Sequence, residues 1–144
     1  MNTITVQVTI SAPIEKVWKY WNEPEHITKW AFASDDWESP HAENDLQNNG
    51  RFLTRMAAKD GSMSFDLTGT YTNVKPMEII EYIMDKSSGE EVGRNVSISF
   101  ESIGETTKVT ETFDPEHENP EEMQRAGWQA ISDNFKKYVE SQAN

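Results

Sequence analysis

The stretch that decides the fold is the last one, NPEEMQRAGWQAISDNFKKYVE, at residues 119–140. Asn119 is expected to cap a helix here, because its side-chain oxygen can accept a free backbone N–H of the first turn. Pro120 suits the next position, and Glu121 and Glu122 face the positive end of the helix dipole. Apolar groups then recur at helical spacing, at Met123, Gly127, Ala130, Ile131, Phe135 and Tyr138. The segment is therefore predicted to be one long amphipathic helix that packs its apolar stripe against a sheet.

The chain before this helix alternates between apolar and polar residues with the period of a β-strand. The alternation predicts strands near residues 4–10, 52–56, 63–71, 80–84, 96–100 and 109–113. Turns are expected at Asp60-Gly61, Lys75-Pro76, Ser87-Ser88-Gly89 and Gly104-Glu105. Ala12-Pro13 opens a short helix, a second one runs from about Asn22 to Trp30, and residues 31–50 are expected to be loop with one short strand. Consecutive strands with grouped helices predict an α+β fold with the helices on one sheet face.

The composition limits the class of protein before any motif is considered. At 144 residues and 35% hydrophobic content, residues 1–144 are expected to form a single domain with one core. No apolar run is long enough to cross a membrane, and the N-terminus has no basic region followed by an apolar stretch, as a secretory signal would. The absence of cysteine fits the reducing cytoplasm. A formal charge of −12 repels phosphate backbones, so nucleic acid is not an expected partner.

Several short motifs, in a fixed order, cover nearly the whole chain. They are ISAPIEKVW at residues 10–18, EHITKW at 25–30, GRF at 50–52, GTY at 69–71 leading to VKP at 74–76, and GW at 127–128. Together they resemble the START-like (SRPBCC) helix-grip superfamily, and more closely its branch related to the activator of the heat-shock protein 90 ATPase. The resemblance implies a Bet v-type fold, in which a curved antiparallel sheet of about six or seven strands wraps a long C-terminal helix, with two short helices after the first strand. It also implies an elongated cavity between sheet and helix, and it transfers no catalytic residue.

The candidate ligand-binding residues are mainly aromatic, apolar and methionine side chains on the expected inward faces. They are Trp30, Phe32, Trp37, Phe52, Met56, Phe65, Leu67, Gly69, Tyr71, Tyr82, Met84, Ile98, Glu111, Phe113, Met123, Gly127, Trp128 and Ile131. The alternative is that such side chains simply fill a core. Gly127 in mid-helix costs about 1 kcal/mol relative to Ala, and its missing side chain would let a strand or a ligand approach. Gly69 is expected to act likewise within its strand, and Met56, Met63, Met84 and Met123 suit an adaptable lining.

Glu111 is the single residue that the sequence most directly suggests as a functional group. Strict alternation places it on the same face as Val109 and Phe113, so it should look inward. A buried carboxylate needs a partner, and the expected ones are Tyr82, Tyr71 and the indole N–H of Trp128. The alternative is a bulge or register shift that turns Glu111 outward.

Three further groups of residues, which are aromatic, histidine and acidic, bear on the function. Trp30, Phe32 and Trp37 either fix the loop after the second helix to the sheet or form the mouth of a cavity. The three histidines, at 26, 41 and 117, show no paired spacing, and no nucleotide, serine-hydrolase or HExxH motif occurs, so no metal or cofactor is expected. Acidic residues at Glu116, Glu118, Glu121 and Glu122 are expected to favour the start of the last helix, with a docking patch for a basic partner as the alternative.

Three functions stay open. The first is binding of a small hydrophobic or amphipathic molecule between the sheet and the C-terminal helix. The second is an enzyme of cyclase, dehydratase or hydrolase type that uses Glu111 as acid and base. The third is a module that regulates a chaperone ATPase, which only the family resemblance suggests. A homodimer is compatible with all three.

Overall fold

The computed structural model describes residues 3–85, 93–116 and 119–142. The expected turn at Ser87-Ser88-Gly89, together with His117 and Glu118, lies outside the described residues. No helix in the described ranges combines the length and the apolar character that a membrane span requires.

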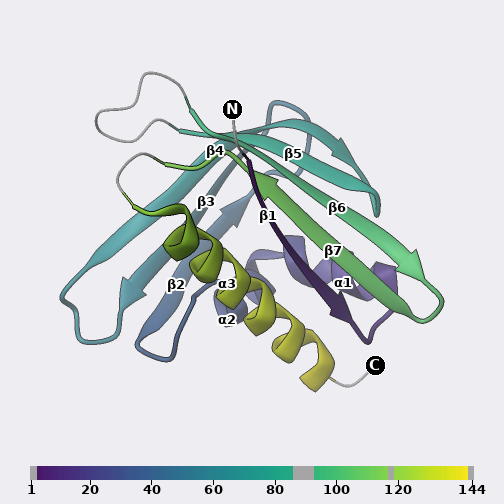
Figure 1. The fold of residues 1–144 in the computed structure, drawn as a ribbon, viewed down its shortest axis with the longest axis horizontal. Helices are drawn as coiled ribbons and strands as arrows, with labels where there is room; N and C mark the ends of the chain where they lie inside the picture. The colour runs from purple at the N-terminus through teal and green to yellow at the C-terminus, as the bar shows by residue number, and fades with distance from the viewer. Residues whose placement is uncertain (1–2, 86–92, 117–118, 143–144) are drawn as a thin grey trace.

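Within the described residues, one antiparallel sheet of seven strands forms the larger part of the structure (Figure 1). Its strands lie in the order β1-β7-β6-β5-β4-β3-β2, so that β1 and β2 are the two edges. The bounds are β1 Ile4–Ile10, β2 Trp37–Asn44, β3 Arg51–Ala58, β4 Ser64–Lys75, β5 Ile79–Met84, β6 Asn95–Ile103 and β7 Thr106–Phe113. The strand expected between residues 31 and 50 is therefore β2, which joins the sheet beside β3.

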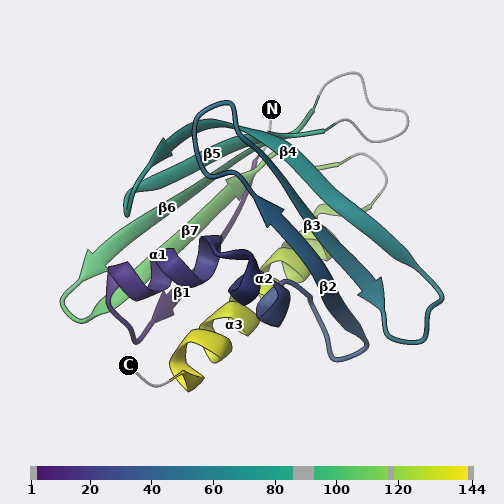
Figure 2. The ribbon, with the colours of Figure 1, turned by 180° about the vertical axis from the view of Figure 1, so that it is seen from behind.

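Three helices accompany the sheet, α1 at Ile14–Asn22, α2 at Pro24–Trp30 and α3 at Glu121–Ser141. The sheet curls, and α3 crosses its concave side (Figure 1). Seen from behind, α1 and α2 lie near the C-terminal half of α3 (Figure 2). The predicted α+β helix-grip architecture is thus confirmed, including the two short helices after the first strand.

The alternation of the strands predicts which residues are buried. In β7, Val109 is 1% exposed, Glu111 5% and Phe113 1%, so no bulge turns the carboxylate outward. In β4 the expectation fails at the start of the strand, where Met63 is 60% and Phe65 49% exposed. These two residues belong to the end of the β3–β4 hairpin, where Phe65 meets Trp37 of β2 at the open end of the concave face, whereas Tyr71 further along β4 is buried.

The start of α3 differs from the prediction in its cap. Pro120 occupies the N-cap position without a side-chain cap, and the amide of Asn119 donates a hydrogen bond to the side chain of Glu116 instead. Gln124 instead fastens the segment before the helix to its first turn, because its side-chain amide donates to the Asn119 carbonyl at 2.7 Å and accepts from the Glu116 N–H at 2.8 Å. Glu121 and Glu122 lie in the first turn, as expected for the positive end of a helix dipole.

The helix α3 is bound to one edge of the sheet. Three of its side chains donate hydrogen bonds to successive outward-facing carbonyls of β1: Arg125 to Thr5 at 2.8 Å, Gln129 to Gln7 at 2.9 Å and Lys136 to Thr9 at 2.7 Å. Unpaired backbone groups at a sheet edge otherwise invite pairing with other chains. The helix therefore satisfies the free edge of β1 and takes its own position from it.

Aromatic rings fill the space between the C-terminal half of α3 and the two short helices. The ring of Phe135, which is fully buried, lies 4.8 Å from that of Trp21 and 4.7 Å from that of Trp30, both edge-to-face. The indole of Trp18 meets Phe100 of β6 at 5.1 Å. Edge-to-face pairs of this kind stabilise a core beyond the area that they bury, so this end of the concave face is solidly packed.

Candidate functional site

A cavity of about 640 Å³ lies between the concave face of the sheet and the N-terminal half of α3. Apolar side chains of β3, β4, β5 and β6 form one wall, and Met123, Gly127, Trp128 and Ile131 of α3 form the other. The exposed side chains of Phe65 and Met123, which also line the cavity, belong to its open end. Helix α3 is thus bound to β1 at both ends, and the cavity separates its N-terminal half from strands β3 to β6.

Most of the candidate residues come together at this cavity. Its walls include Trp30, Phe32, Trp37, Phe52, Met56, Phe65, Leu67, Tyr71, Tyr82, Met84, Ile98, Glu111, Met123, Gly127, Trp128 and Ile131. Gly69 and Phe113 do not line it, nor does Met63. That the wall residues touch a ligand stays a prediction.

The two glycines differ from each other. A Cβ built at Gly127 would meet no atom within 4 Å, so this position borders the empty space, and no strand approaches it. A Cβ at Gly69 would lie 2.6 Å from the Ile83 carbonyl oxygen and 2.8 Å from the ring of Phe52. Gly69 is therefore a packing requirement of the sheet, and the expected gap there is filled by Phe52.

Phe113 supports the cavity wall from behind. Its ring stacks on the indole of Trp128 with 3.8 Å between centroids and 12° between planes. The expectation that Phe113 lines the cavity is wrong because the larger indole covers it. Phe113 follows Glu111 by two residues on β7, so the stack holds Trp128 at the part of the cavity wall that Glu111 also lines.

Glu111 lies on the cavity wall, and its hydrogen-bond partner is one that the sequence did not indicate. The hydroxyl of Ser132 in α3 donates to Oε1 of Glu111 at 2.5 Å, and both residues are buried. None of the expected partners, Tyr82, Tyr71 or Trp128, makes a hydrogen bond with this carboxyl in the part of the chain that the structure describes. The sequence contains one signal for this contact: Ser132 follows the expected partner Trp128 by four residues, which places both on one face of the helix.

Burial controls the ionisation of the polar groups in the cavity. Loss of water around Glu111 raises the pKa of its carboxyl to about 7, and the hydrogen bond from Ser132 opposes this shift only in part. Burial, with the nearby carboxyl of Glu111, also raises the pKa of the Tyr82 phenol well above its ordinary value. The Tyr71 hydroxyl donates to Oδ1 of Asn44 at 2.5 Å, and burial raises its pKa too. Both phenols are thus neutral, whereas Glu111 changes charge near neutral pH.

The three aromatic residues that follow the second helix divide between the two interpretations. Trp30 belongs to the packed aromatic cluster, and its indole N–H donates to the Tyr20 carbonyl at 3.0 Å. The carbonyls of Trp30 and Phe32 accept from the amide of Asn134 in α3, which fixes the segment in place. Trp37 lies at the open end, where its ring meets that of Phe65 edge-to-face at 5.8 Å. Trp37 and Phe65 therefore have the position expected of a mouth, and Trp30 has that of a core residue.

Several wall residues were missed by the sequence reasoning. They are Trp21, Ile27, Ala31, Ala33, Ser34, Glu43, Asn44, Thr54, Ile80, Arg94, Glu116, Asn119 and Gln124. Ile80 and Thr54 could have been found, because they alternate in phase with Tyr82 and with Phe52 and Met56. The others reach the cavity from α1, from α2 and the segment that joins it to β2, from β2, from the segments before β6 and α3 and from the first turn of α3, and local periodicity does not report such placements.

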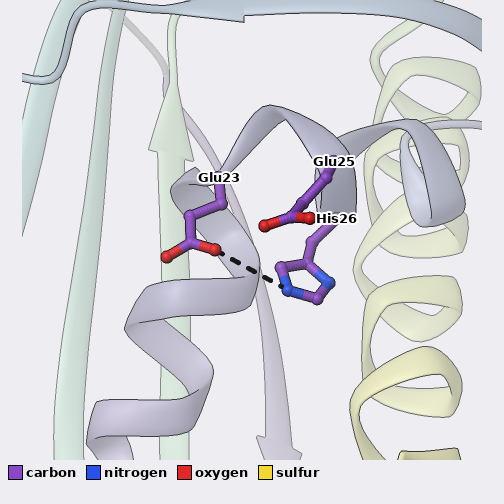
Figure 3. A group of neighbouring side chains, drawn as sticks. All are labelled: Glu23, Glu25 and His26. Carbon is purple, nitrogen blue, oxygen red and sulfur yellow. Dashed lines mark ion pairs between the residues drawn. The ribbon is translucent and has the colours of Figure 1, made fainter.

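One group outside the cavity has the composition of a cation site. Oxygen or nitrogen atoms of Glu23, Glu25 and His26 lie within 4.8 Å of one another at the start of α2 (Figure 3). Nε2 of His26 is 3.8 Å from Glu23, and Nδ1 is 2.7 Å from the Tyr138 hydroxyl. Glu23 and Glu25 suit the positive end of the helix dipole, and the contact of His26 with Tyr138 accounts for the position of its ring without a metal. The other described histidine, His41, makes an exposed pair with Glu43 at 2.7 Å.

The fold and the cavity define a START-like protein of the helix-grip type. A family model described as Activator of Hsp90 ATPase homolog 1-like protein matches residues 11–140. The chain therefore belongs to this family. A search of the curated proteins finds no match.

Solved structures agree with this assignment. The AHSA1-like protein from Aeromonas hydrophila is 40% identical, with a TM-score of 0.87 over 99% of each chain. Chr148 from Cytophaga hutchinsonii is 53% identical, with a TM-score of 0.79 over 100% of this chain and 99% of that one. CV1439 from Chromobacterium violaceum, at 20% identity and a TM-score of 0.84 over 99% and 100% of the two chains, shows the fold alone.

The two glycines give a matched test of where the interior is full. Gly127→Ala should raise the free energy of unfolding by about 0.5–1 kcal/mol, because Ala favours helix and its methyl group enters open space. Gly69→Ala should lower it by about 1–3 kcal/mol, because the methyl group meets a backbone carbonyl. Urea unfolding followed by far-UV circular dichroism measures both changes. A neutral Gly69→Ala variant would contradict the packing described here.

Glu111 should make stability depend on pH. Its pKa is raised in the folded state, so the protonated form is favoured there and stability falls as pH rises from about 4.5 to about 7. The full loss corresponds to about 3 kcal/mol. Glu111→Gln should lack this component, whereas Glu105→Gln, in the exposed turn between β6 and β7, should keep it. Parallel pH profiles for the wild type and Glu111→Gln, measured by urea unfolding, would show that Glu111 is not shifted.

Proposed function

We propose that this protein binds a small hydrophobic or amphipathic molecule in the cavity between the sheet and α3. The observation that supports this most directly is the cavity itself, with a volume of about 640 Å³ and predominantly apolar walls. Sites for small molecules have volumes of about 300–1,000 Å³, are lined mainly by apolar and aromatic side chains, and contain a few placed polar groups. Glu111 and Tyr82 are such polar groups here.

Apolar contact would supply most of the affinity. Burial of apolar surface contributes about 25 cal/mol per Å², and this cavity offers aromatic rings from both walls, such as Phe52 and Trp128. Methionines on the walls, Met56, Met84 and Met123, adapt to ligands of different shape at little cost. We also propose that the protein is located in the cytoplasm, because a chain without cysteine suits a reducing compartment.

Filling the cavity from the helix should block binding. Gly127→Leu projects a side chain into the open space next to Gly127 and should weaken binding of an environment-sensitive apolar dye by roughly tenfold or more. Ala126→Leu, one residue away on an exposed part of α3, is the matched control and should bind the dye normally. The measurement is a titration followed by dye emission, with circular dichroism to check folding. Equal dye binding by both variants would exclude the cavity as the site.

A second candidate function is acid–base catalysis in the same cavity. The observation that favours it is the Glu111 carboxyl, which lies on the cavity wall with a pKa of about 7. A group with a pKa near the working pH is suited to both accept and release a proton. Glu111→Gln should abolish turnover of any substrate found by screening while the dye still binds. Unchanged turnover in this variant would remove Glu111 as the acid–base group.

A further inference from the structure

Two buried residues of the cavity each have a polar side-chain atom without a hydrogen-bond partner in the described part of the chain. Glu111 and Tyr82 are 5% and 8% exposed, and Ser132 occupies only Oε1 of the carboxyl. Within the described ranges, neither Oε2 of Glu111 nor the Tyr82 hydroxyl makes a hydrogen bond. The same ranges contain one side-chain polar atom that is both fully enclosed and without a partner, and it is Oγ of Ser39. Oε2 of Glu111 and the Tyr82 hydroxyl are therefore not fully enclosed. Both atoms therefore reach open space, and the space that the two residues share is the cavity.

These two groups belong to the same part of the sheet. Tyr82 is on β5 and Glu111 on β7, and β6 lies between these strands. Ile98 of β6 pairs with Glu111 on one side and with Ile80, two residues before Tyr82, on the other. The carboxyl is close enough to contribute to the raised pKa of the phenol. Tyr82 and Glu111 thus border one cavity from strands two places apart in the sheet, so a ligand in that cavity lies against both.

Both groups favour a neutral acceptor. The Tyr82 phenol is protonated and can donate a hydrogen bond. A ligand that covers Glu111 removes more water from a carboxyl whose pKa is already about 7, so the neutral acid is favoured in the complex. A carboxyl kept neutral by apolar surroundings donates through its O–H, and Ser132 can still donate to the other oxygen.

Charged ligand ends fit the cavity less well. The carboxyl groups of Glu43 and Glu116 also line it, so a carboxylate ligand meets repulsion. Arg94 also lines the cavity, but it already takes part in another interaction. An ammonium group would require a buried ion pair, whose desolvation cost offsets much of the attraction.

We propose that the ligand carries an uncharged carbonyl oxygen at its polar end, and that this oxygen accepts hydrogen bonds from the hydroxyl of Tyr82 and the carboxyl of Glu111. The ligand class is then an apolar ketone or a related neutral carbonyl compound whose body lies against the aromatic and methionine walls. This inference rests on the proposed function and specifies the ligand of that same cavity.

The test compares three fluorescent probes with one apolar body. They are an acyl dimethylaminonaphthalene ketone, the parent dimethylaminonaphthalene without the acyl group, and the corresponding naphthalene carboxylate. The wild type should bind the ketone about 3- to 10-fold more tightly than the parent, which is the size of one net hydrogen bond. The carboxylate should bind most weakly. The emission of the bound ketone reports directly on hydrogen bonding to its carbonyl group.

Two tyrosine variants separate recognition from packing. Tyr82→Phe removes only a hydroxyl, and it should lower ketone affinity about 3- to 10-fold, shift the bound emission to the blue and leave the parent probe unchanged. Tyr71→Phe is the matched control, because Tyr71 lines the same cavity but its hydroxyl already donates to Asn44. It should leave the preference for the ketone intact.

The outcomes are distinct. Equal binding of all three probes, or a ketone preference that Tyr82→Phe does not change, overturns the carbonyl inference while cavity binding stands. Tightest binding of the carboxylate overturns it as well and indicates that Arg94 selects anions. Failure of the wild type to bind any probe contradicts the proposed function, and the inference falls with it.

Discussion

Hydrogen bonds from side chains of α3 to the outer edge of β1 determine where everything else in this protein lies. They place the long helix along one edge of the curved sheet and satisfy backbone carbonyls that would otherwise be free. The two short helices then occupy the space beside the C-terminal half of α3, where their aromatic rings close the core. What is left is the concave surface opposite the N-terminal half of α3, and that surface is the cavity wall.

The polar chemistry of the cavity follows from the same arrangement. Glu111 is on β7, next to the edge strand to which the helix is bound, so the hydroxyl of Ser132 reaches it from α3. The contact satisfies one carboxyl oxygen and leaves the other at the cavity, in surroundings that disfavour charge. Burial of this group therefore lowers the stability of the protein when the carboxyl is ionised.

Local patterns predicted the elements and their faces well. Alternation correctly turned Glu111 inward beside Val109 and Phe113, and helical spacing correctly placed Gly127 and Ile131 on the inner face of α3. The errors have a common cause. Asn119 does not cap α3, Gly69 is covered by Phe52, and Phe113 is covered by Trp128. Each depends on a neighbouring side chain whose position the spacing of residues does not report.

The sequence by itself determined the order of strands and helices, the inward faces of the strands and the family to which the chain belongs. The elements and their faces depend on periods of two and 3.6 residues, which act within one element, and the family follows from the resemblance of short motifs along the chain. Only the tertiary structure decided that Ser132 meets Glu111, that the space beside Gly127 is open and that the space beside Gly69 is full. Such contacts join residues far apart in the chain, and they depend on where a helix lies across a curved sheet.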